Sequence, residues 1–201
     1  MTIVPELEFK FLLDKSNFNQ PKRFLIRTPE DYKGEFPAVL KVSSDKITHK
    51  TELGAVVSDI KTMENFSEVF SEMKNKFPGE TLYAEEMAKK GVEVIIGLIK
   101  DQNFGKLLLF GIGGFYSELI KDVTFKKVPI DKYDAEDILN ELKFGGLFDG
   151  YRGLKVSREI IVNLLLKVSD FSEGIDFSQI DFNPVFLYED RYLIIDAKMI
   201  V

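Results

Sequence analysis

Cysteine is absent from this sequence of 201 residues, and histidine occurs only once, at position 49. Without cysteine the chain can form neither disulfides nor thiolate metal sites, and it has no cysteine nucleophile. A metal site built from several histidines is excluded because the sequence has only one. Covalent catalysis would therefore fall on His49 or on a hydroxyl group.

An excess of basic residues and a long apolar run are also missing. The 27 lysines and arginines face 33 acidic residues, giving a net charge of -6, which disfavours general electrostatic binding to nucleic acid. The longest apolar stretches, such as LLLFGIGGF at 107–115, are too short to cross a membrane. The first 15 residues carry acids and a proline where a signal peptide would be apolar. We expect a cytoplasmic protein.

Local patterns predict a mixture of strands and helices that alternate along the chain. An amphipathic helix is expected at 64–77, and two more begin near Asp134 and Ser157. The last two strands form a hairpin that turns at Glu189-Asp190. The remaining strands are expected at 23–28, 37–43, 54–60, 81–87, 92–100 and 106–112, and in YSELI and FKKVPI.

The order of these elements predicts an α+β protein with two lobes and a cleft between them. We place the lobes at residues 1–79 and 80–201, and expect a largely antiparallel sheet in the second lobe because its strands follow one another closely. Clefts between lobes are preferred ligand sites.

Lys41 and the segment around His49 are candidates for phosphate chemistry. Lys41 lies in an apolar strand, where it is either an edge lysine that reaches solvent or a fixed charge for a nucleotide phosphate. His49 is either a loop residue or a metal ligand, general base or phosphate-accepting nucleophile. Its neighbour Lys50 would hold a transferring phosphoryl group by charge.

Two further segments carry possible ligand-binding groups. FGIGGFYSEL at 110–119 lacks the lysine of a phosphate-binding P-loop, and fits either a turn or an anion-binding nest of backbone amides. Asn183 and Asp196 are expected near facing ends of the terminal hairpin, where an amide oxygen and a carboxylate suit Mg²⁺. The alternative for this pair is turn formation before a strand.

Together these segments resemble the ATP-grasp β subunit of the NDP-forming acyl-CoA synthetases. The resemblance runs from about residue 37 to the C-terminus, through PAVLKVSSDKITHKTELGAVV, AEEMAKKGVEVIIGLIKDQNFGKLLLFGIGGFYSELIKDVTF, GYRG, IDFNP and IIDAK. It implies an ATP-grasp fold that holds ADP or ATP with Mg²⁺ between two lobes.

The resemblance also implies roles for individual residues. It makes Lys41 a nucleotide-phosphate contact and His49 a carrier that relays phosphate between a partner's phosphohistidine and the nucleotide. It makes Asn183 and Asp196 the Mg²⁺ ligands. The remaining positions that match nucleotide-site segments are Glu85 and Glu86 of the adenine and ribose pocket, Glu93, Gly111, Gly113 and Gly114.

The implied activity is that of an ADP-forming acid–CoA ligase such as acetate–CoA ligase, which converts acyl-CoA, ADP and phosphate to acid, CoA and ATP. No CoA-binding motif is present, so a separate CoA-binding α subunit is expected, most simply in a heterotetramer. An Asp or Glu phosphate is an alternative carrier. A succinate–CoA ligase-like enzyme and a nucleotide-binding module without catalysis are the alternative functions.

Overall fold

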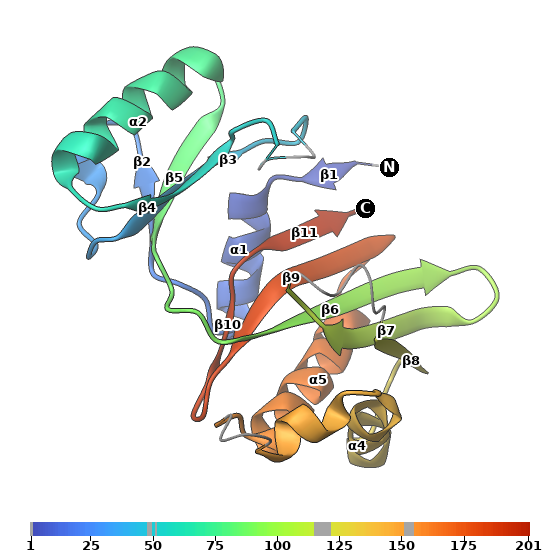
Figure 1. The fold of residues 1–201 in the computed structure, drawn as a ribbon. Helices are drawn as coiled ribbons and strands as arrows, with labels where there is room; N and C mark the ends of the chain where they lie inside the picture. Colours follow the sequence, from blue (N-terminus) through green and yellow to red (C-terminus); the bar gives the residue numbers. More distant parts are fainter. Residues whose placement is uncertain (1, 48–49, 51, 115–121, 151–154) are drawn as a thin grey trace.

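The computed structural model describes residues 2–47, 50, 52–114, 122–150 and 155–201, and these residues form two lobes (Figure 1). Each lobe is built on its own β-sheet, one seven-stranded and one four-stranded. All strand pairs are antiparallel. The predicted α+β class is thus confirmed. Within the described part of the chain, no helix is long and apolar enough to span a membrane.

The smaller lobe consists of a four-stranded sheet with one helix packed on it. The strand order is β2 (Arg23–Ile26), β5 (Thr81–Glu86), β3 (Ala38–Ser43) and β4 (Val56–Ile60). Helix α2 (Met63–Lys76) begins where the Thr62 side chain accepts a hydrogen bond from the Asn65 backbone. Its apolar stripe buries Phe66 and Met73 in the core of this lobe. A short 3₁₀ helix, η1 (Pro29–Asp31), follows β2.

The larger lobe is the seven-stranded sheet with helices on one face (Figure 1). The main path runs through β1 (Ile3–Val4), β11 (Ala197–Ile200), β9 (Gln179–Leu187), β6 (Val92–Asp101), β7 (Gly105–Ile112) and β8 (Val123–Lys127), and β10 (Tyr192–Ile194) pairs with β9. Helices α4 (Lys132–Glu141) and α5 (Arg158–Glu173) complete its core, and η2 (Gly145–Asp149) lies between them.

A helix near the N-terminus, α1 (Glu6–Lys15), lies between the two lobes (Figure 1). Its apolar side joins the larger core, where the Phe9 ring stacks on Phe182 with centroids 5.9 Å apart. Strand β1 pairs with β11, so the two ends of the chain meet at one edge of the larger sheet. Residues 2–15 are therefore part of the larger lobe, although they precede the smaller lobe in sequence.

Most elements lie where the sequence predicts them, and the hairpin at Glu189-Asp190 is confirmed by the pairing of β9 with β10. Sheet membership differs from the boundary predicted between residues 79 and 80. Strand β5 was expected in the second lobe but pairs with β2 and β3. Residues 3–4 were placed in the first lobe with no strand predicted there, but they form β1 and pair with β11. Helix α1 was not predicted. The predicted strand YSELI lies outside the described residues.

Candidate functional site

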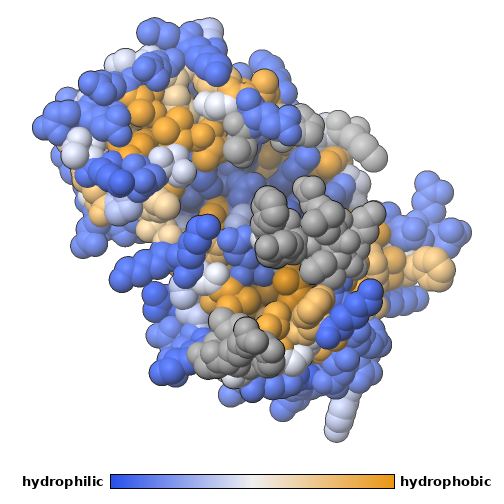
Figure 2. Space-filling model, viewed as in Figure 1, coloured by the Kyte–Doolittle hydropathy of each residue, from blue (hydrophilic) through white to orange (hydrophobic). Residues whose placement is uncertain are grey.

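A cleft of about 470 Å³ lies between the lobes. Figure 2 shows the surface hollowed and hydrophilic between the two lobes. Both sheets contribute to its walls, together with the start of α1. The charged and amide side chains among its lining residues are Glu6, Lys41, Lys50, Glu52, Glu85, Glu86, Lys90, Asn183, Asp196 and Lys198.

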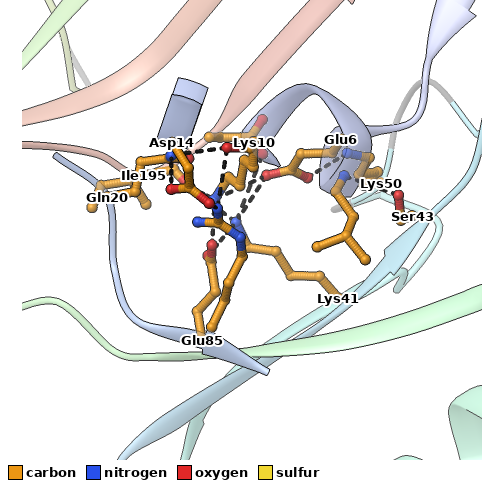
Figure 3. Close-up of polar contacts among 12 residues, drawn as sticks. Glu6, Lys10, Asp14, Gln20, Lys41, Ser43, Lys50, Glu85 and Ile195 are labelled. Carbon is orange, nitrogen blue, oxygen red and sulfur yellow. Dashed lines mark hydrogen bonds and ion pairs between the residues drawn. The ribbon is translucent and has the colours of Figure 1, made fainter. Parts of the chain in front are cut away.

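Lys41 is the central cation of the cleft (Figure 3). It lies on β3, an interior strand, and only 4% of the residue is exposed, so the edge-lysine alternative is wrong. Its ammonium nitrogen lies 2.9 Å from Glu85 Oε2 and 3.2 Å from Glu6 Oε1, and donates to the Ile195 carbonyl oxygen at 3.0 Å. An ammonium group has three donors. Lys41 would therefore have to exchange one of these partners to donate to a phosphate.

Lys50 reaches the cleft from the segment that follows β3. Its ammonium nitrogen lies 2.5 Å from Glu6 Oε2, and 17% of its side chain is exposed. Because Glu6 is its only ion-pair partner among the described residues, Lys50 retains donors that can face a ligand. Its role as a phosphate-binding charge stays a prediction.

Glu85 and Lys10 form the buried end of the same cluster (Figure 3). Lys10, on α1, is fully buried and donates to Glu85 Oε1 at 2.5 Å and to the Ile195 carbonyl oxygen at 2.9 Å. The Lys10 ammonium nitrogen also lies 3.3 Å from Oε1 of Glu6, which precedes Lys10 by one helical turn. The carboxylate of Glu85 is thus shared between Lys10 at Oε1 and Lys41 at Oε2.

The cluster keeps its charges because each has an opposite charge beside it. Burial alone would raise the pKa of Glu6, but the ammonium groups of Lys41, Lys10 and Lys50 lower it well below its usual value. Burial alone would lower the pKa of Lys41, but Glu6 and Glu85 raise it above its ordinary range. The pKa of Lys10 is lowered, first by burial and then by Lys41. Removing one member of such a cluster leaves another buried charge with fewer opposite charges beside it, which costs stability.

Asn183 and Asp196 both line the cleft, and their backbones lie side by side. The Asn183 backbone amide donates to the Asp196 carbonyl oxygen at 3.2 Å, where β9 faces the link between β10 and β11. The pKa of Asp196 is raised to about 7 by the loss of solvent around its carboxyl group and by the Glu6 carboxylate, against the opposing effect of Lys41. The loss of solvent is partial, because the side chain lines the cleft and 42% of its surface stays accessible.

This pair fits a magnesium ion that shares its coordination with a ligand. No group of three or more acidic or histidine side chains within the described ranges could hold a metal by itself. Mg²⁺ commonly takes one or two protein oxygens and completes its octahedron with water and phosphate oxygens. A divalent cation at Asp196 would also offset the repulsion between its carboxylate and that of Glu6.

Of the two other predicted glutamates, Glu86 and Glu93, only Glu86 lines the cleft. Glu86 lines the cleft and is paired at its edge with Lys22, 3.4 Å away. Glu93 lies opposite Phe186, a lining residue, in the pairing of β6 with β9, but does not itself line the cleft. The roles of these side chains as nucleotide contacts stay predictions.

The glycine stretch is explained in part by strand packing. A Cβ atom at Gly111 would lie 2.5 Å from Val123 Cγ1, and one at Gly113 would lie 3.0 Å from the Glu93 carbonyl carbon. Gly114 has a φ of +84°, which favours glycine. None of these described glycines lines the cleft. Their predicted role as a phosphate cradle stays a prediction.

His49 lies outside the described residues, as do Thr48 and Thr51. Conversely, the sequence analysis missed two charged residues of α1: Glu6, which lines the cleft, and Lys10, which is buried in the ion cluster beside it. Their signals were a proline before the helix, two acids in its first turn and a Glu–Lys pair spaced i, i+4. These signals predict a helix but not that its charged face is buried.

Comparison with known proteins identifies the family. A model of the ATP-grasp domain matches residues 2–201. The chain belongs to the ATP-grasp family. The β subunit of ADP-forming acetate–CoA ligase I from Pyrococcus furiosus is 35% identical over 210 residues, which cover 98% of this chain and 90% of that subunit. The predicted resemblance to ADP-forming acyl-CoA synthetase β subunits is thereby confirmed.

Longer relatives contain the same ATP-grasp segment as one part of a larger protein. ADP-forming acetate–CoA ligase II from Archaeoglobus fulgidus is 34% identical over 201 residues, which cover 98% of this chain but only 30% of that protein. The ATP-grasp chain thus spans less than a third of this relative.

Solved structures agree with the fold. An acetyl-coenzyme A synthetase 1 from Ca. Korarchaeum cryptofilum, in complex with coenzyme A and Ca-AMPCP, superposes with a TM-score of 0.90 and 29% identity, covering 100% of this chain and 94% of that one. A second structure of that protein, with coenzyme A and Mg-AMPPCP, has its phosphohistidine segment pointing towards the nucleotide binding site. Its TM-score is 0.85 at 29% identity, covering 99% of this chain and 92% of that one. The predicted ATP-grasp fold is confirmed.

Proposed function

We propose that this chain is the nucleotide-binding β subunit of a cytoplasmic ADP-forming acyl-CoA synthetase of the acetate–CoA ligase type. The observation that carries the proposal is the presence of Lys41, Lys50, Asn183 and Asp196 around one cleft between the lobes. Phosphoryl transfer requires mainly positioning and neutralisation of charge, which ammonium groups and Mg²⁺ supply.

In the proposed site, ADP or ATP lies in the cleft with its phosphates toward the lysines. Lys50 is the first candidate for a direct phosphate contact because it faces the cleft with one described ion-pair partner. Asn183 and Asp196 would hold Mg²⁺, which would neutralise phosphate charge when bound. The structure of the korarchaeal relative in complex with Mg-AMPPCP supports a magnesium nucleotide as the ligand.

His49 is proposed as the phosphate carrier. A neutral imidazole nitrogen is nucleophilic near pH 7. It would take the phosphoryl group from a phosphohistidine of the partner, freeing that histidine, and pass the group to a terminal oxygen of ADP, forming ATP. Lys50 follows His49 in the sequence, and its ammonium group would balance the charge of the carried phosphate.

The overall reaction also needs a CoA site, which we assign to a separate α subunit in a heterotetramer. The relative from Pyrococcus furiosus is named as a β subunit, which supports an ATP-grasp chain that acts with a separate subunit. In the longer relative from Archaeoglobus fulgidus, the matching segment is one part of a larger protein. The carboxylic acid would be selected mainly by that other part.

Phosphate labelling tests the proposal. The chain is incubated with Mg²⁺, γ-labelled ATP and the CoA-binding subunit produced from the same genome. We expect label on this chain that acid removes and base does not, as for a phosphoramidate. His49→Ala should abolish the label and reduce acyl-CoA formation by about 10³-fold or more, since an essential covalent step is lost.

Thr48→Ala and Thr51→Ala are the matched controls, because they remove the hydroxyl groups on either side of His49. Both should retain the acid-labile label. Normal turnover by His49→Ala, or an acid-stable label that disappears in a threonine variant, would contradict the relay. Failure of the unaltered chain to bind Mg-ADP in calorimetry would contradict nucleotide binding itself.

A further inference from the structure

We propose that Glu6 is a positioning residue that sets the place of the Lys50 ammonium group in the cleft, and so joins helix α1 to the phosphate site. The inference rests on the proposed nucleotide function and deepens it. It gives a role to the start of the chain, for which the sequence analysis predicted none.

The two oxygens of the Glu6 carboxylate divide their contacts between different elements (Figure 3). Oε2 lies 2.5 Å from Lys50 Nζ, and Oε1 lies 3.2 Å from Lys41 Nζ. Oε1 also lies 3.3 Å from Lys10 Nζ. One carboxylate therefore links the segment after β3, strand β3 itself and helix α1.

Glu6 is held firmly enough to act as an anchor. Only 2% of the residue is exposed. It is the first residue of α1, where the helix dipole favours a negative charge. The next backbone amide, Leu7 N, donates to Ser43 Oγ at 3.0 Å, which fastens this end of the helix to β3. The carboxylate thus has a fixed origin from which to direct a flexible lysine.

Lys50 depends on this anchor more than Lys41 does. Lys41 has Glu85 and the Ile195 carbonyl oxygen as further partners, whereas Glu6 supplies the one ion pair recorded for Lys50 in the described residues. A lysine side chain has many rotamers, and an unanchored ammonium group contributes less to binding because ordering it costs entropy. Without Glu6 we expect the Lys50 ammonium group to leave its place in the cleft.

Nucleotide calorimetry with two Glu6 variants tests the inference. Glu6→Asp keeps the buried charge but shortens the side chain, and Glu6→Gln keeps the length but removes the charge. With the unaltered chain as reference, each is titrated with AMP and with ADP in the presence of Mg²⁺. We expect ADP to bind about 10-fold or more weakly, the effect of one charge-assisted contact. AMP affinity should change less than about 2-fold, since AMP lacks the outer phosphate.

Glu8→Gln is the matched control, because Glu8 lies in the same first turn of α1 but is exposed. It should bind both nucleotides as the unaltered chain does. Equal weakening of AMP and ADP, unchanged ADP affinity in both Glu6 variants, or unfolding of both variants would show a structural role only and overturn the inference. If the unaltered chain binds no ADP, the proposed function fails, and this inference fails with it.

Discussion

Glu6 and Asp196 are two carboxylates of one cleft whose pKa values shift in opposite directions. Glu6 faces three ammonium groups, which outweigh its burial and lower its pKa. Asp196 loses solvent and faces Glu6, which together outweigh Lys41 and raise its pKa to about 7. The difference comes from their neighbours, because both side chains carry the same chemical group. Asp196 is therefore the carboxylate that would gain most from a divalent cation.

Asp196→Asn should raise the Mg²⁺ concentration needed for half-maximal nucleotide binding, because an amide oxygen is a weaker ligand for a hard cation than a carboxylate. We expect an increase of about 10-fold or more, as for the loss of one charged contact. The measurement is calorimetry with ADP at a series of Mg²⁺ concentrations.

Asp190→Asn serves as the control, since Asp190 is exposed in the turn between β9 and β10 and contacts Arg191. It should leave the Mg²⁺ dependence unchanged. An Asp196→Asn variant with the Mg²⁺ dependence of the unaltered chain would remove this residue from the metal site.

At the scale of elements, helix α1 contributes both apolar and charged side chains to the interior. Phe9 and Leu13 pack in the larger core, and Lys10 lies on the side that faces the cleft cluster. Lys10, from α1, and Lys41, from β3, both donate to the Ile195 carbonyl oxygen. The helix therefore connects the sheet of the smaller lobe to the edge of the larger one.

Lys10→Met should lower the melting temperature even though it replaces a buried charge with an apolar group of similar length. The change leaves Glu85 with Lys41 as its only remaining ion-pair partner among the described residues. A buried charge left without any partner costs about 3–5 kcal/mol, and this is an upper bound here because Glu85 keeps Lys41. For a chain of this size we expect a fall of up to roughly 20 °C, at about 2–4 °C per kcal/mol.

Thermal unfolding followed by circular dichroism measures this effect. Lys15→Met is the matched control on the same helix, because Lys15 is exposed. It should unfold within about 2 °C of the unaltered chain, as is usual for surface substitutions. If Lys10→Met is as stable as this control, the buried ion cluster does not stabilise the fold.

At the scale of the whole molecule, the chain begins and ends in the same lobe. Strand β1 completes the larger sheet beside β11, and α1 covers part of its core before the chain enters the smaller lobe. The smaller sheet is thus inserted between segments of the larger lobe. Clefts formed in this way have residues from both ends of the chain in their walls, here Glu6 and Asp196.

A chain that begins at Pro21 should therefore fail to fold, although it still contains all the residues of the smaller sheet and most of those of the larger one. Removal of α1 uncovers Phe182 and leaves Lys41 and Glu85 without Lys10 and Glu6. Size-exclusion chromatography and circular dichroism should show aggregation or an unfolded chain. A chain lacking only residues 1–2 should stay folded, and a cooperative unfolding transition in the longer truncation would contradict this account.

The sequence by itself determined the elements whose signals are local. Capping by Thr62 and Ser157, the apolar stripes of α2 and α5 and the terminal hairpin follow from neighbours along the chain. Its ordered motifs also determined the family, and the positions of Lys41, Asn183 and Asp196 in one cleft agree with that assignment.

Only the tertiary structure decided where the first and last segments pair and which charges meet. Glu6 and Glu85 are 79 positions apart, yet Lys41 lies between them. A sequence pattern records the charge of each residue but not its distance from charges on other elements. The energy of a buried ion depends on that distance and on the lost water. For that reason Lys10 reads along the chain as an ordinary helix lysine, and becomes a buried partner of Glu85 only when the lobes come together.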